Sequence, residues 1–176
     1  MSGKILVAVD GSKNTDKTLK KAIEAARKEE AELIILHVNT PHILSEDELA
    51  YAEERCGEKF KRLVSGASLP AFTTDDKSER KYIGDYVKAR QIFQKVYGED
   101  ILKQGVDQAK KAGLEAVRSL NEEGDVAKIV LDVAKKENVD LIVVGRRGHG
   151  RIAEFFLGSV AQKILQYADR SVLTVE

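Results

Sequence analysis

Cysteine is almost absent from the chain, and long apolar runs are missing. Cys56 is the only cysteine, which excludes an internal disulfide and a zinc site built from thiolates and favours a reducing compartment. The apolar run nearest the amino terminus, Ile5 to Val9, is too short for a signal peptide core or a membrane span. We therefore expect a cytoplasmic protein with no membrane partner.

An excess of either charge is also missing. The chain carries 29 basic and 29 acidic side chains, so a broad basic surface for nucleic acid or anionic lipid is not expected. Any basic patch has to be local, and the segment from Arg146 to Arg151 is the obvious candidate. The length of 176 residues suits one domain with a substantial core, and we expect a single domain over residues 1–176.

Several well-known phosphate and nucleophile motifs are absent as well. Gly145 and Gly150 have the spacing of a Walker loop, but Arg151 and Ile152 stand where that loop needs a lysine and a hydroxyl residue. The turn after the first predicted strand, residues 10–12, reads Asp-Gly-Ser and does not begin a GxGxxG fingerprint, and no GxSxG elbow occurs. None of the corresponding enzyme classes is indicated.

What is present is a glycine-rich stretch between a strand pattern and a helix pattern. The apolar run Leu141 to Val144 is typical of a buried parallel strand, and Gly145 ends it. Gly148 follows, then nine residues, then Gly158 and Ser159 at the start of a helical pattern. A helix N-terminus offers N–H groups and partial positive charge, and glycines let main-chain amides approach an anion closely. The stretch therefore predicts a phosphate site.

Positive side chains accompany this stretch, and we expect them to supply charge to the phosphates: Arg146, Arg147, His149 and Arg151. The alternative interpretation is that the glycines only end a strand and start a helix, with the arginines in solvent. Three glycines, a serine and both flanking elements coincide, which favours the phosphate site.

Apolar runs that alternate with helical patterns predict a parallel sheet. The predicted strands span residues 4–9, 33–38, 115–120, 141–144 and 171–175. If the early units wind one way and the later ones the other, the chain forms a doubly wound, Rossmann-like α/β fold with strand order 3-2-1-4-5. Strands one and four are then neighbours, and the ligand crevice of such a sheet lies between Asp10 and Gly145.

Residues 39–114 are far more than one crossover helix needs, so we expect a helical insertion between strands two and three, over about residues 40–100. The patterns predict a helix over about 46–64, a loop over 66–78, a helix over about 80–96, and a further helix ending at Gly113. We interpret the apolar stripes of the insertion as core, with a partner-binding surface as the alternative.

Two residues at predicted strand ends can serve a nucleotide. Asp10 can accept a hydrogen bond from a ribose hydroxyl or hold a divalent cation that bridges phosphates, although it is also a good turn former. Val38 ends the second strand, where main-chain N–H and C=O groups can read an adenine base. We interpret His37 as a satisfied strand histidine.

The spacing of Gly145, Gly148, Gly158 and Ser159 resembles the nucleotide-binding signature of the universal stress protein family, as do the VAVDGS turn after strand one and the LHV of strand two. The resemblance covers the opening βαβ unit and the chain from Gly124 onward. It implies ATP, ADP or AMP as ligand, with Mg or Mn held by the phosphates and Asp10. It also implies a homodimer that pairs the last strand. The nucleotide-binding residues expected by position, with Arg147 added for its charge, are Asp10, Val38, Gly145, Arg147, Gly148, Gly158, Ser159 and Val160.

We therefore expect an ATP-binding, stress-response regulatory protein, with a protein partner whose nature the sequence leaves open. Two alternatives stay open. One is a slow ATP hydrolase or nucleotidyl-transfer enzyme on the same site, for which Asp10 and His149 are the evident candidate bases; the other is a dimeric interaction scaffold without ligand. Nothing places a base in line with a γ-phosphate, so binding is favoured over catalysis and no catalytic residue is assigned.

Overall fold

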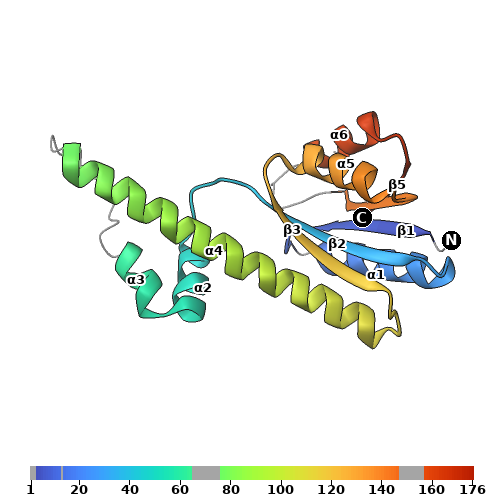
Figure 1. The fold of residues 1–176 in the computed structure, drawn as a ribbon, viewed down its shortest axis with the longest axis horizontal. Helices are drawn as coiled ribbons and strands as arrows, with labels where there is room; N and C mark the ends of the chain where they lie inside the picture. The colour runs from blue at the N-terminus through green and yellow to red at the C-terminus, as the bar shows by residue number, and fades with distance from the viewer. Residues whose placement is uncertain (1–2, 13, 65–75, 147–156) are drawn as a thin grey trace. The chain divides into compact units, whose positions relative to one another are not determined.

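A computed structural model describes residues 3–12, 14–64, 76–146 and 157–176 of the chain. It contains a five-stranded parallel sheet with the order β3-β2-β1-β4-β5 (Figure 1). The strands are β1 (Lys4–Val9), β2 (Glu32–Asn39), β3 (Val117–Glu123), β4 (Leu141–Gly145) and β5 (Ser171–Val175). This confirms the doubly wound order 3-2-1-4-5. It also makes β1 and β4 neighbours, so their carboxyl ends lie side by side at one edge of the sheet.

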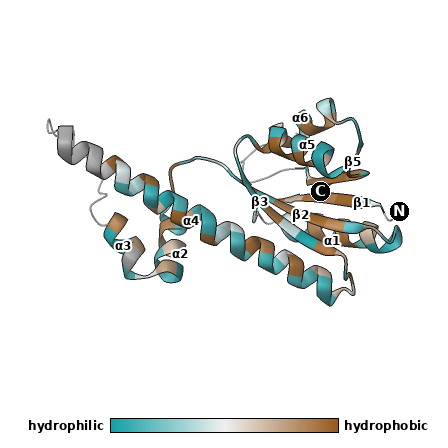
Figure 2. Ribbon diagram, viewed as in Figure 1, coloured by the Kyte–Doolittle hydropathy of each residue, from teal (hydrophilic) through white to brown (hydrophobic). Residues whose placement is uncertain are grey.

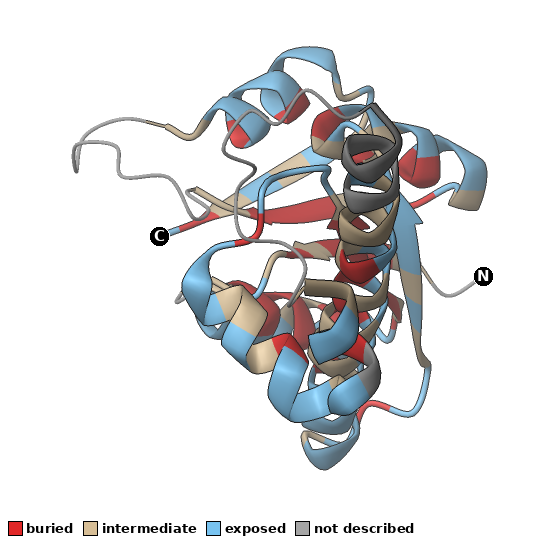
Figure 3. Cartoon of the chain, turned by 90° about the vertical axis from the view of Figure 1, so that its left-hand side faces the viewer, coloured by how far each residue is buried: buried red, intermediate tan, exposed pale blue. Residues whose placement is uncertain are grey.

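The central strands are buried on both faces, which explains why their sequences are nearly continuous apolar runs (Figure 2). One face packs against α1 (Thr15–Lys28) and the last residues of α4 (Asp76–Lys111), with Leu33 and Ile35 in that core. The other face packs against α5 (Val126–Glu137) and α6 (Ser159–Tyr167), with Ile34 and Leu36 in that core. Figure 3 shows the burial concentrated on these central strands and the inner sides of the helices.

Helix starts and stops follow local chemistry. The Asp125 side chain caps α5 by accepting a hydrogen bond from the Lys128 N–H at 2.9 Å. That backbone hydrogen bond lowers the pKa of the Asp125 carboxyl. Gly113 lies just beyond α4 with φ of 83°, and the Leu114 N–H donates to the Ala109 carbonyl at 3.0 Å, which confirms the predicted glycine stop.

A helical insertion lies between β2 and β3, as predicted, but its helices differ from the expected ones. The helix predicted over 46–64 is two helices, α2 (Glu46–Cys56) and α3 (Glu58–Val64), because Gly57 has a left-handed φ of 63° that ends the first. The helices predicted over 80–96 and up to Gly113 are one, α4 (Asp76–Lys111). An isolated glycine such as Gly98 costs only about 1 kcal/mol inside a helix and does not break it.

The predicted loop 66–78 falls on α4 for its last residues, 76–78, while 65–75 lie outside the described residues. By contacts between Cα atoms the chain divides into two compact units: Met1–Pro41 with Asp100–Glu176, and His42–Glu99. The second, which we call the helical unit, has its own core of Leu44, Ala52, Phe60, Ala89 and Phe93. Within it the Phe93 and Tyr97 rings stack with centroids 5.1 Å apart.

A charged network occupies the amino edge of the sheet, opposite the strand ends considered below. The Arg118 guanidinium pairs with Glu32, at 2.7 Å, and with Glu137, and Lys4 lies within 4.0 Å of both carboxylates. Burial alone would lower the pKa of Arg118, but the two carboxylates outweigh it and raise that pKa. This edge is therefore bound up in structural ion pairs. No helix within the described ranges is long and apolar enough to cross a membrane.

Candidate functional site

The first turn after β1 is organised by Asp10. Its Oδ1 accepts hydrogen bonds from the Ser12 N–H at 2.9 Å and from the Thr15 hydroxyl at 3.0 Å. Gly11 between them has φ of 76°, a left-handed conformation that favours glycine. One oxygen of Asp10 thus builds the turn that leads into α1. The structure gives Asp10 this turn-forming role, and its role toward ribose or metal stays a prediction.

Ser12 is the feature of this turn that sequence reasoning did not single out as a ligand. Its Oγ is buried and has no hydrogen-bond partner among the residues that the structure describes. A buried hydroxyl without a partner is costly in a folded protein and calls for an explanation such as a ligand. Ser12 lies two residues beyond Asp10, at the carboxyl edge of the sheet, so the signal that could have found it is its place after the Asp-Gly pair.

The two ends of the glycine-rich stretch meet at the end of β4. The Gly158 N–H donates to the Arg146 carbonyl at 2.9 Å, and the Arg146 N–H donates to the Val175 carbonyl at 2.6 Å. Residues 145–146 and 158–159 therefore lie together although twelve positions separate their nearest members in the sequence. Arg147 and Gly148 lie outside the described residues, as do His149 and Arg151.

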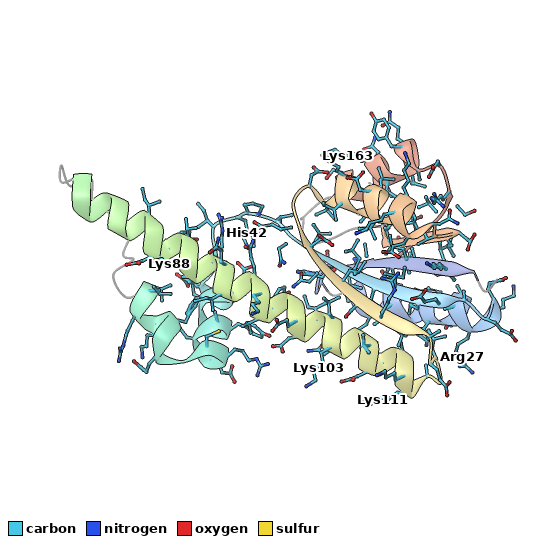
Figure 4. All side chains as sticks on the ribbon, in the orientation of Figure 1. Arg27, His42, Lys88, Lys103, Lys111 and Lys163 are labelled. Carbon is cyan, nitrogen blue, oxygen red and sulfur yellow. The ribbon has the colours of Figure 1, made fainter. Side chains whose placement is uncertain are left out.

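The N-terminus of α6 begins at this closure. Gly158 is the N-cap, with φ of −62° and ψ of 147°, and as a glycine it brings no side-chain acceptor to the first turn. Ser159 and Val160 are the first two helical residues, and both are exposed. Their N–H groups belong to the set that an α-helix leaves without partners inside the helix, which together with the helix dipole suits an anion. Lys163, labelled in Figure 4, lies one turn further on and is 3.6 Å from Asp125.

Val38 lies at the same edge of the sheet. The register between β1 and β2 ends at Val9 and His37, so Val38 is one residue beyond it, while it still pairs with Glu122 of β3. Its side chain packs in the core under α5. The neighbouring His37 is 5% exposed, and its Nδ1 lies 2.9 Å from the Val9 carbonyl oxygen, as expected of a satisfied strand histidine.

Arg146 does not present its side chain as a simple surface cation. Its Nη1 lies 2.6 Å from Glu176 Oε1. The positive charge that the sequence assigned to this residue is therefore compensated by a carboxylate. Anion binding by the amides and hydroxyls described above stays a prediction.

A metal held by protein side chains alone has no support in the described part of the chain. Within it no group of three or more His, Cys, Asp or Glu side chains is placed to hold a metal ion. Asp10 belongs to no such group, so a divalent cation here needs most of its oxygen ligands from a bound polyphosphate and water, which is the usual arrangement for Mg²⁺.

The described geometry can be compared with known proteins. The family model described as "Universal stress protein family" matches residues 1–176. The Bacillus subtilis universal stress protein YxiE is 30% identical, over 99% of both chains. Among solved structures, UspA from Lactobacillus plantarum has a TM-score of 0.67 at 16% identity, covering 99% of this chain and 98% of that one.

A second solved structure bears a ligand. The universal stress protein from Archaeoglobus fulgidus in complex with dAMP has a TM-score of 0.57 at 18% identity and covers 100% of both chains. At these identities the structural likeness establishes the fold alone. The full-length match to the family model and the extent of the similarity to YxiE establish more: this chain belongs to the universal stress protein family.

Proposed function

We propose that this protein binds an adenine nucleotide, ATP with ADP or AMP as alternatives, at the carboxyl edge shared by β1 and β4. The observation that carries the proposal is the hydrogen bond from the Gly158 N–H to the Arg146 carbonyl. It holds an α6 N-terminus without a side-chain cap at the end of β4, and β4 is the neighbour of β1, which Asp10 follows directly. An anion-binding helix end and a polar turn are thus presented at the same edge of the sheet.

Each residue has a role in this proposal. The phosphates are held by the amides and small side chains of Gly145, Gly148, Gly158, Ser159 and Val160, with charge from Arg147. Asp10 faces the ribose or a phosphate-bound Mg or Mn ion, and the main chain of Val38 reads the adenine. The buried Ser12 hydroxyl supplies a further hydrogen bond to the ligand, which would give that atom the partner it lacks.

Two observations support an adenine nucleotide over other anions. The register of β1 and β2 stops before Val38, which leaves main-chain groups at the position where a base can be read. In addition, the Archaeoglobus fulgidus relative of the same fold binds dAMP, an adenine nucleotide. The divalent ion would neutralise phosphate charge, and the protein residues themselves would orient the nucleotide and shield it from water.

We propose a regulatory binding role in the cytoplasm in preference to hydrolysis. Asp10, which follows β1, is the candidate carboxylate for the proposed phosphate site. One of its oxygens already accepts two hydrogen bonds within the turn. A group held in this way is well placed to position a ligand but poorly placed to accept a proton from an attacking water. Binding of nucleotide would then stabilise one arrangement of the loop and helix at this edge.

The experiment is a calorimetric titration of the purified chain, freed of bound nucleotide, with ATP, AMP and GTP in the presence of Mg²⁺. We expect saturable binding of the adenine nucleotides and weaker binding of GTP. Gly158 has a backbone conformation that any residue can adopt, so the variant Gly158→Val should fold. The branched valine side chain would obstruct the phosphates, and we expect it to lower ATP affinity at least tenfold. Equal ATP affinity in this variant and the parent would remove the glycine stretch from the function.

A further inference from the structure

The helical unit carries a groove that the nucleotide proposal does not use. It lies between α3 and α4, has a volume of about 480 Å³, and is lined by Arg62, Leu63, Lys88, Gln91, Ile92 and Lys95. Its lining on α4 falls at positions separated by three or four residues, so these side chains form one stripe along the helix (Figure 4 labels Lys88). The groove therefore combines an apolar floor with a basic rim.

Two lysines, Lys88 and Lys95, line this groove. Among the described residues its lining includes no carboxylate. Lys88 has one nearby acidic partner, Asp85 at 3.5 Å, but the Lys88 side chain is largely exposed and such a surface pair is weak. The chemistry of the groove favours an occupant with a branched aliphatic side chain flanked by carboxylates, because both the floor and the rim are then matched.

A segment with that chemistry occurs on the helical unit itself. Ile43 is 83% exposed, the highest value among the exposed large apolar side chains of the described residues. Glu46 and Asp47 follow in the first turn of α2, and both are exposed. We call these three residues the acidic key.

The acidic key is held outward by its neighbours. Leu44 is buried in the core of the helical unit, and its N–H donates to the Tyr86 hydroxyl at 2.8 Å. Anchoring of Leu44 fixes the backbone next to Ile43, whose exposure shows that it does not fill the groove of its own chain. A single exposed apolar side chain is common on protein surfaces, so an interface is indicated only by the match between this segment and the groove.

We propose that the helical unit is a self-association surface, in which the acidic key of one copy enters the basic groove of a second copy. If the two copies are related by a two-fold axis, each supplies one key and one groove, so that two identical contacts form. This interface is separate from pairing of β5, because all its residues belong to the helical unit, and it does not depend on nucleotide binding.

Charge reversal on each side provides the test. In the groove variant, Lys88→Glu is combined with Lys95→Glu; in the key variant, Glu46→Lys is combined with Asp47→Lys. Each variant alone brings like charges together at both contacts, so we expect its self-association, measured by sedimentation at low salt, to weaken at least tenfold relative to the parent. An equimolar mixture of the two variants places opposite charges together at both contacts, so a mixed assembly should form with near-parental affinity.

Controls separate this contact from other effects. Ile43→Ser retains every charge and removes the apolar anchor, so it should also weaken self-association. Lys17→Glu with Lys20→Glu reverses the same number of charges on the exposed side of α1 and should leave self-association unchanged. Circular dichroism of each variant reports whether the helices remain folded. The proposal is overturned if the parent and all the variants associate equally, as they would if only β5 pairing held the assembly, or if the mixed variants fail to associate.

Discussion

At the residue scale, Ser12 tests whether the turn after β1 binds a ligand. Its buried Oγ has no partner within the described part of the chain, whereas the neighbouring Thr15 hydroxyl donates to Asp10. Loss of an unpartnered hydroxyl leaves the folded protein unharmed, while loss of a satisfied one removes roughly 1 kcal/mol of stability.

Ser12→Ala should therefore keep or slightly raise the thermal midpoint while weakening ATP binding about threefold to tenfold, the range for one hydrogen bond. Thr15→Val should show the opposite pattern, with lower stability and a smaller change in affinity. Thermal unfolding with and without ATP measures both effects. A Ser12→Ala protein that binds ATP like the parent would show that the hydroxyl serves no ligand.

Gly158 combines stability and function at one position. As a glycine N-cap it leaves the first turn of α6 without a side-chain acceptor. Gly158→Asp would supply one and should stabilise the helix by a few tenths of a kcal/mol. The same carboxylate would occupy the amides proposed for phosphate and repel it, so ATP affinity should fall at least tenfold.

The matched control for this change is Asp125→Gly, which removes the side-chain cap of the adjacent helix α5. It should lower the thermal midpoint and leave ATP affinity unaltered. If Gly158→Asp loses stability and retains affinity, the proposed use of the α6 N-terminus is wrong.

At the element scale, two glycines of α4 differ in their surroundings. A Cβ on Gly105 would lie 3.3 Å from Ile35 Cδ1 and 3.5 Å from Leu19 Cδ2, whereas a Cβ on Gly84 would meet nothing within 4 Å. Gly105 thus permits close packing of α4 on the core.

Gly105→Val should destabilise the protein by about 1–3 kcal/mol, the usual range for overpacking. Gly84→Val makes the same substitution in the same helix and should be near neutral, because it introduces no contact and replaces a poor helix former. Urea unfolding of both variants provides the comparison. Equal losses in the two variants would contradict the account, because packing against Ile35 would then not explain the cost at Gly105.

The start of α2 depends on pH through Glu48. The Glu48 carboxylate accepts a hydrogen bond from the Ser45 N–H at 2.7 Å, and the Ser45 hydroxyl accepts one from the Glu48 N–H. The second carboxylate oxygen of Glu48 lies 2.8 Å from His42 Nε2. Burial alone would raise the pKa of Glu48, but the hydrogen bonds from Ser45 and His42 outweigh it and hold the pKa below its ordinary value of 4.5.

Because the folded pKa of Glu48 is lowered, its contribution to stability is present above the ordinary value of 4.5 and is lost as the pH falls through the folded value. We expect the protection of the α2 amides, relative to the intrinsic exchange rate at each pH, to fall over that acidic range. Glu48→Gln keeps a neutral acceptor and should flatten the pH dependence. An unchanged profile in this variant would assign the pH dependence to other carboxylates.

The elements differ in how far the sequence predicts them. The predicted bounds of β1 and β5 match the observed ones, and those of the other strands differ at their ends. The central strand β1 is predictable because a buried parallel strand has an apolar run that stops at a polar residue. The insertion was harder. Gly57 breaks a helix whose apolar pattern continues through Phe60, and a break set by one backbone conformation is invisible to periodicity.

At the scale of the whole molecule, topology brings distant residues together in a way that spacing alone cannot. The neighbourhood of β1 and β4 was predictable from the direction of the βα crossovers, and it sets Asp10 and Gly145 at one edge. Two features were not predictable, because both depend on side-chain positions in the folded chain. They are the pairing of Arg146 with Glu176 and the lack of a partner for the Ser12 hydroxyl among the described residues.

The two proposals concern different compact units of the chain. The nucleotide proposal uses residues of Met1–Pro41 and Asp100–Glu176, while the self-association proposal uses residues of His42–Glu99. Each proposal can therefore fail without the other, and a variant in one unit serves as a control for the other.

Hydrogen exchange of the whole chain with and without Mg-ATP tests the central claim most directly, because it reports on the amides themselves. The account predicts slower exchange on ATP addition at the turn after β1, at the end of β4 and at the first turn of α6, and unchanged exchange in α2 and α3 of the helical unit. Unchanged exchange at the amides of Ser159 and Val160 at saturating ATP would contradict it.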